Sequence, residues 1–149
     1  MKTLFNSSDN GELTARIEAL RPDTPARWGK MNAAQMLAHL QAPLRVGLGD
    51  VRLPQVFMGM LFGRLVLKTF ISGKPWKHGM PTDRTFIIAD RRDFDEERTK
   101  LLILIRRFDD SHGRNIGSNR HPFFGKLSSE EWGQLMWSHI NHHLDQFGK

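Results

Sequence analysis

Two segments of the chain each carry a full set of helix-start signals, and these signals constrain the fold more than any other feature. In "MNAAQM", Asn32 can cap a helix and Gln35, three residues later, can reach back to it. In "LSSEEW", Ser128 and Glu131 have the same spacing. Both segments also place apolar residues on either side of the cap, at the spacing of a hydrophobic staple. One helix is therefore predicted to open in residues 31–44, and another to run from about 129 to 147.

Apolar residues at helical spacing predict three more helices, at about residues 10–20, 56–71 and 95–108, with the middle one beginning near Pro54. Helices without credible strands favour an all-α fold, an antiparallel bundle with one long crossover connection. No linker or repeat divides the sequence, so we expect a single domain over residues 1–149.

The connection between two of these helices, residues 73–92, is long and irregular, and Trp76 and Phe86 are expected to anchor it to the body of the protein. Its one short run suited to a strand extends from Thr85 to Ile88. A small α+β domain built on that run is the alternative to the all-α fold.

Charge and composition argue against several classes of partner. The net charge is +6, but the basic residues occur as scattered pairs beside acidic ones, so no nucleic acid partner is expected. The apolar segment from Val56 to Ile71 contains Arg64 and Lys68 and is shorter than the roughly 20 residues that span a bilayer. We interpret it as a core helix or a homodimer interface, and expect no membrane partner; a helix lying on an acidic membrane surface is the less favoured alternative.

The N-terminal "MKTLFNSSDN" turns polar before a signal-peptide core accumulates, which predicts a cytoplasmic protein. The chain has no cysteine, so a tightly held transition metal would have to use imidazole or carboxylate ligands. Seven histidines are available for that role.

Two histidines lie within the apolar stripe of the predicted C-terminal helix. Trp132, Met136, His139 and Phe147 all fall within about 40° of His143 around the helix axis. A spacing of four residues stacks the two rings on one face, as in H-x-x-x-H metal-binding pairs. The neighbouring His142 lies about 100° from His143 around the helix axis and is the poorer candidate for a ligand. Core histidines that hydrogen-bond to carbonyls or a carboxylate remain the alternative.

A third ligand would favour the metal site. The candidates are His39, which lies in the capped "QMLAHLQAPL" segment, and three histidines in loops, namely His78, His112 and His121. Of the loop residues, His78 and His112 are followed by glycine in polar segments and are interpreted as surface residues.

The segments "MNAAQMLAHLQ", "HPFFGKLSSEEW" and "SHINHHLDQFG" together resemble the DinB/YfiT-like superfamily, in particular a branch without an assigned function. The resemblance extends from about Trp28 to the end of the chain. It implies a four-helix bundle with a long crossover and a divalent metal held by His39, His139 and His143. The run "HLDQF" departs from the Arg-Gly-Gln-like sequence of many relatives, which puts substrate contacts carried over from them in doubt.

The same resemblance places His121 near the metal, as a fourth ligand, a hydrogen-bond donor or a catalytic general acid. A loop histidine that holds the turn before Pro122 is the alternative.

Three neutral imidazoles leave a zinc, nickel or manganese ion with its full charge and with open coordination positions. By analogy with characterised relatives, the expected function is transfer of a low-molecular-weight thiol to a small-molecule electrophile. Metal-dependent hydrolysis and a non-catalytic metal-binding scaffold are the alternatives. The basic charge suits an anionic cofactor or substrate, with Arg45, Lys74 and Lys77 as candidate contacts.

Overall fold

The structure, a computed structural model, describes residues 1–80, 84–118 and 120–149. Within these residues the chain forms five α-helices and one 3-10 turn and has no strand, which confirms the all-α prediction. The elements are α1 (Ser7–Glu18), α2 (Ala33–Gly47), α3 (Phe57–Phe70), η1 (Arg84–Phe86), α4 (Phe94–Asp110) and α5 (Ser129–Gln146).

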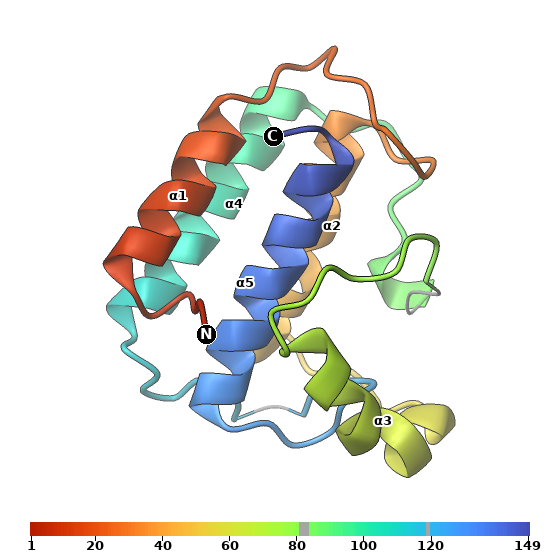
Figure 1. Ribbon diagram of the computed structural model, residues 1–149, viewed down its shortest axis with the longest axis vertical. Helices are drawn as coiled ribbons and strands as arrows, with labels where there is room; N and C mark the ends of the chain where they lie inside the picture. The colour runs from red at the N-terminus through yellow and green to blue at the C-terminus, as the bar shows by residue number, and fades with distance from the viewer. Residues whose placement is uncertain (81–83, 119) are drawn as a thin grey trace.

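Helices α1, α2, α4 and α5 lie side by side and enclose the apolar core (Figure 1). Helix α2 packs on α4 and α5, and α1 packs on the same two helices. The largest fully buried side chains include Trp132 of α5 and Phe108 of α4, which lie in this core. The stripe of Trp132, Met136 and Phe147 is buried as predicted, so the face of α5 that carries His139 is turned towards the interior.

The predicted caps of α2 and α5 are both present. Asn32 accepts from the backbone N–H of Gln35, whose side chain accepts from the Asn32 N–H, and Ser128 and Glu131 form the same reciprocal pair. Two other helices begin elsewhere than predicted. Helix α1 begins at Ser7 because Asn6 caps it. Helix α3 begins at Phe57, after Val56, whose backbone is extended and whose N–H donates to the Pro122 carbonyl.

Residues 48–93 connect α2 to α4 and contain α3 and η1. Thr85 and Phe86 of the run expected to be extended lie in the 3-10 turn Arg84–Phe86, and residues 87–88 form no strand, so the α+β alternative is wrong for the described residues. Phe86 and Trp76 pack inward and anchor the connection, as predicted. Residues 81–83 of the connection lie outside the described part of the chain.

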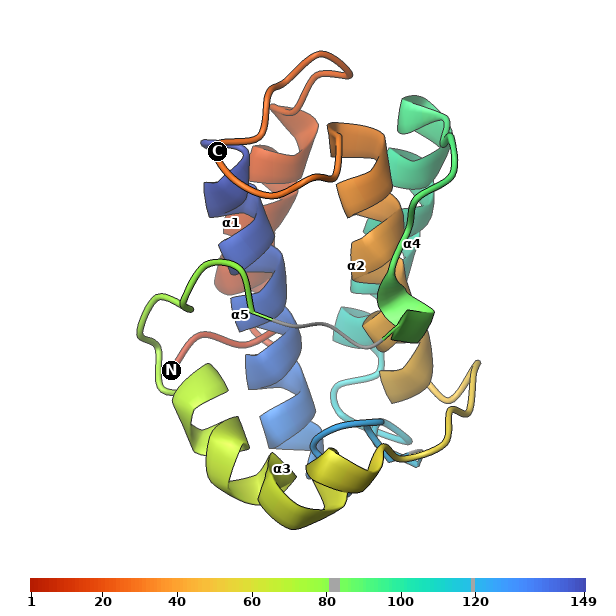
Figure 2. The same cartoon turned by 90° about the vertical axis from the view of Figure 1, so that its right-hand side faces the viewer.

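Helix α3 lies across one end of the other four helices rather than beside them (Figure 2). The interpretation of this segment as a core helix is wrong, because only Gly59, Gly63 and Leu67 of α3 are buried. A Cβ atom on either glycine would overlap the Phe123 carbonyl oxygen, so glycine is what allows α3 to lie against that loop. No described helix is long and apolar enough to cross a bilayer.

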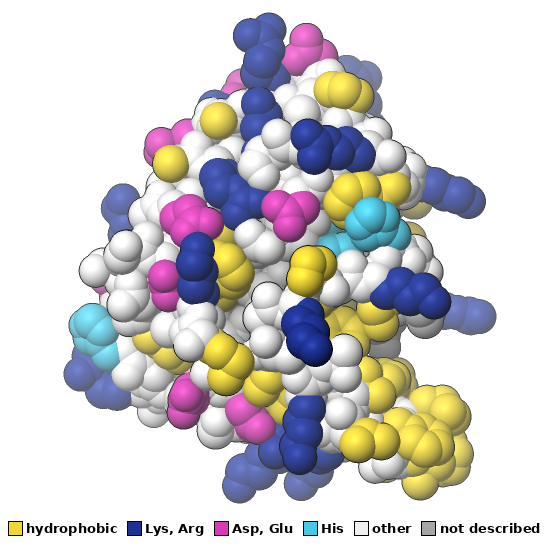
Figure 3. All heavy atoms as spheres, in the orientation of Figure 1, with side chains coloured by type: hydrophobic (Ala, Val, Ile, Leu, Met, Phe, Trp, Pro, Cys, Tyr) yellow, Lys and Arg dark blue, Asp and Glu magenta, His cyan; other side chains and the backbone are white. Residues whose placement is uncertain are grey.

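The outward face of α3 carries large hydrophobic side chains that are about half exposed or more, and Leu65, at 72%, is the most exposed of them. Figure 3 shows these hydrophobic side chains gathered at the end of the molecule that α3 forms. They are Phe57, Met58, Met60, Leu61, Phe62 and Leu65. The expected homodimer through this helix stays a prediction.

Candidate metal centre

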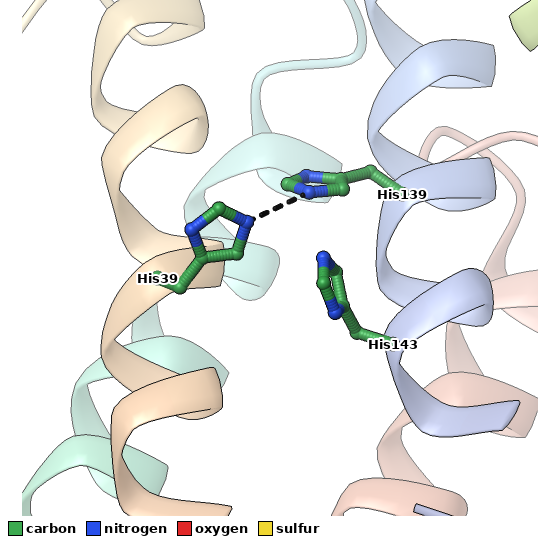
Figure 4. Close-up of side chains that lie close together, drawn as sticks. All are labelled: His39, His139 and His143. Atoms are coloured by element: carbon green, nitrogen blue, oxygen red, sulfur yellow. Dashed lines mark hydrogen bonds between the residues drawn. The ribbon is translucent and has the colours of Figure 1, made fainter. Parts of the chain in front are cut away.

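Three histidines from two helices converge between α2 and α5. His39 extends from α2, and His139 and His143 extend from successive turns of α5, with their rings turned towards one another (Figure 4). Each offers one ring nitrogen to the cluster, and these nitrogens lie within 4.8 Å of one another. The residues selected from helical phase and from the resemblance are therefore brought together in space.

His39 is held by a carbonyl of the long connection. Its Nδ1 lies 2.7 Å from the Phe86 oxygen, which can only accept, so the Nδ1–H is the donor. In the neutral ring this leaves a lone pair on Nε2, the atom that faces the cluster. A carbonyl that fixes the tautomer in this way is a typical outer partner of a metal-binding histidine.

His139 faces that lone pair directly. Its Nε2 lies 3.1 Å from the Nε2 of His39. Because the His39 atom accepts, the His139 Nε2 carries the proton and donates it in the neutral pair. Two nitrogens bound to one zinc ion in a tetrahedral site are separated by about 3.3 Å, given zinc–nitrogen bonds of about 2.0–2.1 Å. This pair of atoms already lies at nearly that separation.

His143 is oriented by Gln146. Its Nδ1 lies 2.7 Å from Gln146 Oε1, and Gln146 Nε2 donates to the Trp28 carbonyl at 2.6 Å. The carbonyl can only accept, so it fixes which end of the Gln146 amide faces the histidine. The His143 Nδ1–H must therefore be the donor, which leaves the Nε2 lone pair free to act as a ligand.

The cluster favours neutral imidazoles. Burial is the main cause of a lowered pKa in all three, and it lowers the pKa of His139 well below the ordinary value and that of His143 to about 3. For His39 the hydrogen bond to Phe86 partly opposes this effect. At neutral pH all three rings are uncharged, which is the form that binds a metal ion.

His121 lines the same pocket as the three clustered histidines, yet its ring also holds the turn. Its Nδ1 accepts from the backbone N–H groups of Phe123 and Phe124 at 3.1 and 3.2 Å. Holding the turn is the role that the sequence analysis gave as the alternative to a place near the metal. A catalytic role for His121 stays a prediction.

The remaining histidines lie outside the cluster. His142, on the shoulder of α5, stacks on Trp76, with ring centroids 5.3 Å apart. His78 is exposed as expected, but it also lines the pocket and stacks on Trp28, with ring centroids 3.7 Å apart. His112 is exposed and lies in the turn after α4. Of the three cations proposed as anion contacts, only Lys77 lines the pocket.

Sequence reasoning did not identify the groups that orient the ligands. The Phe86 and Trp28 carbonyls carry no residue-type signal, because any residue can supply a backbone oxygen. Gln146 had a detectable signal, since it follows His143 by three residues on the same helix and can reach its ring.

No curated protein and no solved structure matches the sequence. A family model does match it, over residues 3–149, and its description is a protein of unknown function. The chain therefore belongs to the DUF1569 family.

Proposed function

We propose that the protein is a metal-dependent enzyme whose divalent ion, zinc, nickel or manganese, is held by His39, His139 and His143. One observation carries this proposal: three neutral imidazoles, one from α2 and two from α5 at least 100 residues further along the chain, present nitrogens within 4.8 Å of one another. Core histidines that served only packing would each need a separate partner, whereas two of these direct a lone pair at a shared point.

The residues present fit such an ion. His39 and His143 are held in the required tautomer by the Phe86 carbonyl and by Gln146. His139 would release its Nε2 proton from the hydrogen bond with His39 and carry the proton on Nδ1 instead. An ion with three neutral ligands supplies Lewis-acid chemistry, lowering the pKa of a bound water or thiol.

For the reaction, we propose thiol-dependent transfer to a small electrophile, by analogy with the DinB/YfiT-like superfamily and its four-helix bundle. In this proposal the pocket walls exclude water from the reacting groups. His121 acts as a hydrogen-bond donor through Nε2–H, because adding a proton at Nδ1 would break its bonds to two backbone N–H groups.

Metal analysis of the purified protein tests the site. We expect one equivalent of divalent metal, lost in His39→Ala and in His143→Ala. His142→Ala is the matched control, because it removes a pocket imidazole outside the cluster, and it should retain the metal. Full retention by both ligand variants would reject the three-histidine site.

The reaction is tested separately with the metal-loaded protein. Conjugation of a generic aryl halide is followed with several cellular thiols, and ester hydrolysis is measured in parallel. Turnover that requires both thiol and metal supports the transferase. Metal-bound protein with no turnover in either assay would instead indicate a non-catalytic scaffold.

A further inference from the structure

The pocket that contains the histidine cluster has a volume of about 1090 Å³. Pockets for organic ligands span roughly 300–1,000 Å³. This pocket is at the upper end of that range, and is therefore larger than a metal ion and its water ligands require. The part of it that the structure describes is lined mainly by apolar and aromatic side chains. Its volume and its apolar lining therefore favour an organic ligand with a sizeable apolar body.

Four rings form one side of this pocket, and we call them the aromatic wall: Trp28, Trp76, His78 and His142. Trp28 and His78 stack with an interplanar angle of 11°, which joins the loop before α2 to the connection after α3. The Trp76 ring stacks over the rings of His139 and His142, with centroid separations of 5.5 and 5.3 Å. The wall thus extends from an exposed histidine to the cluster, and gives an aromatic or extended aliphatic group an aromatic surface to pack against.

Three cations line the same pocket and are exposed to solvent, so they lie at its mouth: Lys30, Lys77 and Arg84. The described lining residues include no carboxylate. The ion pairs found within the described part of the chain involve none of the three cations. We call this set the cationic mouth, and its charge favours an anionic group on the ligand.

We infer that the pocket binds an organic anion, with its apolar body against the aromatic wall and its anionic group at the cationic mouth. This inference deepens the proposed function and rests on it for the ligand's role as substrate or cofactor. Binding of the anion itself needs only the wall and the mouth, so it is expected in metal-free protein as well.

Two matched probes test the inference on chelator-treated protein by isothermal titration calorimetry. 2-Naphthylacetate and 2-(2-naphthyl)ethanol share one ring system and differ in charge. A single cation about 4 Å from a carboxylate in water contributes about fivefold, so we expect the acid to bind about fivefold more tightly than the alcohol. Equal affinities for the two probes would overturn the inference.

Charge reversal at the mouth locates the effect. We expect the exposed double variant Lys77→Glu/Arg84→Glu to lose the preference for the acid and to bind the alcohol as before. An unchanged preference would place the anion elsewhere and reject the inference.

The exposed face of α3 could adsorb naphthyl compounds, so Leu61→Ser/Leu65→Ser is the second control; neither residue lines the pocket. Binding of both probes should survive in it, and loss of both would also reject the inference. Zinc titration of the same preparation reports on the metal centre separately. Anion preference without zinc binding would reject the proposed function alone, and zinc binding without anion preference would reject this inference alone.

Discussion

Replacing Gln146 by methionine tests the candidate metal centre through one side chain outside the three histidines. The amide bridges two groups, since it accepts from His143 Nδ1 at 2.7 Å and donates to the Trp28 carbonyl at 2.6 Å. Methionine has a similar length but offers neither a strong acceptor nor a donor. The substitution therefore leaves the His143 ring free to rotate away from the cluster.

Two magnitudes follow from this geometry. Loss of the outer hydrogen bond of a metal ligand typically lowers metal affinity about 10–100-fold. The unpaired His143 N–H and Trp28 carbonyl each cost about 1–3 kcal/mol of folding free energy, towards the lower end here because both groups are only partly buried. Zinc affinity is measured by competition with a fluorescent chelator, and the free energy of unfolding by urea titration of metal-free protein.

Gln146→Glu is the matched control, because it keeps an oxygen acceptor for His143 while it loses the donor to Trp28 and adds a negative charge. It should be destabilised like the methionine variant and still bind zinc within a few-fold of the parent. If Gln146→Met folds and binds zinc as tightly as the parent does, then His143 does not coordinate through Nε2 in the orientation described.

Three further outcomes are expected. Burial lowers the pKa of His143 from 6.5 to about 3, so the free energy of unfolding of metal-free protein should fall as the pH falls from 6.5 towards 3. The expected loss is about 1 kcal/mol per pH unit for each such histidine. Equal free energies of unfolding at pH 7.5 and 5 would contradict this. Gly63→Ala should lower the free energy of unfolding by about 1–3 kcal/mol, because its Cβ would overlap the Phe123 carbonyl, whereas Gly11→Ala, with open space around it, should stabilise α1 slightly. Light scattering should show a homodimer that Leu61→Glu converts to a monomer; a monomeric parent at micromolar concentration would contradict it.

The local signals in the sequence predicted the helix caps and the cluster well, for a physical reason. A capping box involves residues three apart, and helical phase places His139 and His143 on one face whatever surrounds the helix. The third histidine was different. His39 was one of four candidates. Its place in a capped helix favoured it and the resemblance selected it, because the approach of α2 to α5 is a tertiary contact that no local pattern encodes.

Helix α3 shows where hydrophobic pattern misleads. Its run of Phe, Met and Leu resembles a buried helix, and burial was the natural prediction. The structure buries the two glycines instead, because only they can lie against the Phe123 backbone, and the large side chains are therefore turned outward. The apolar composition predicted that this helix packs against another surface. It could not predict which face of the helix the rest of the chain would cover.

The groups that orient the histidines belong to the same loops that wall the pocket. Phe86, whose carbonyl holds His39, lies in η1 beside the mouth residue Arg84, and Trp28, whose carbonyl holds Gln146, is itself part of the aromatic wall. A ligand that packs against these loops therefore restrains the same backbone carbonyls that fix the imidazole tautomers. If the protein binds both the metal and the anion proposed above, the two affinities are linked, and by thermodynamic reciprocity each changes the other by the same factor.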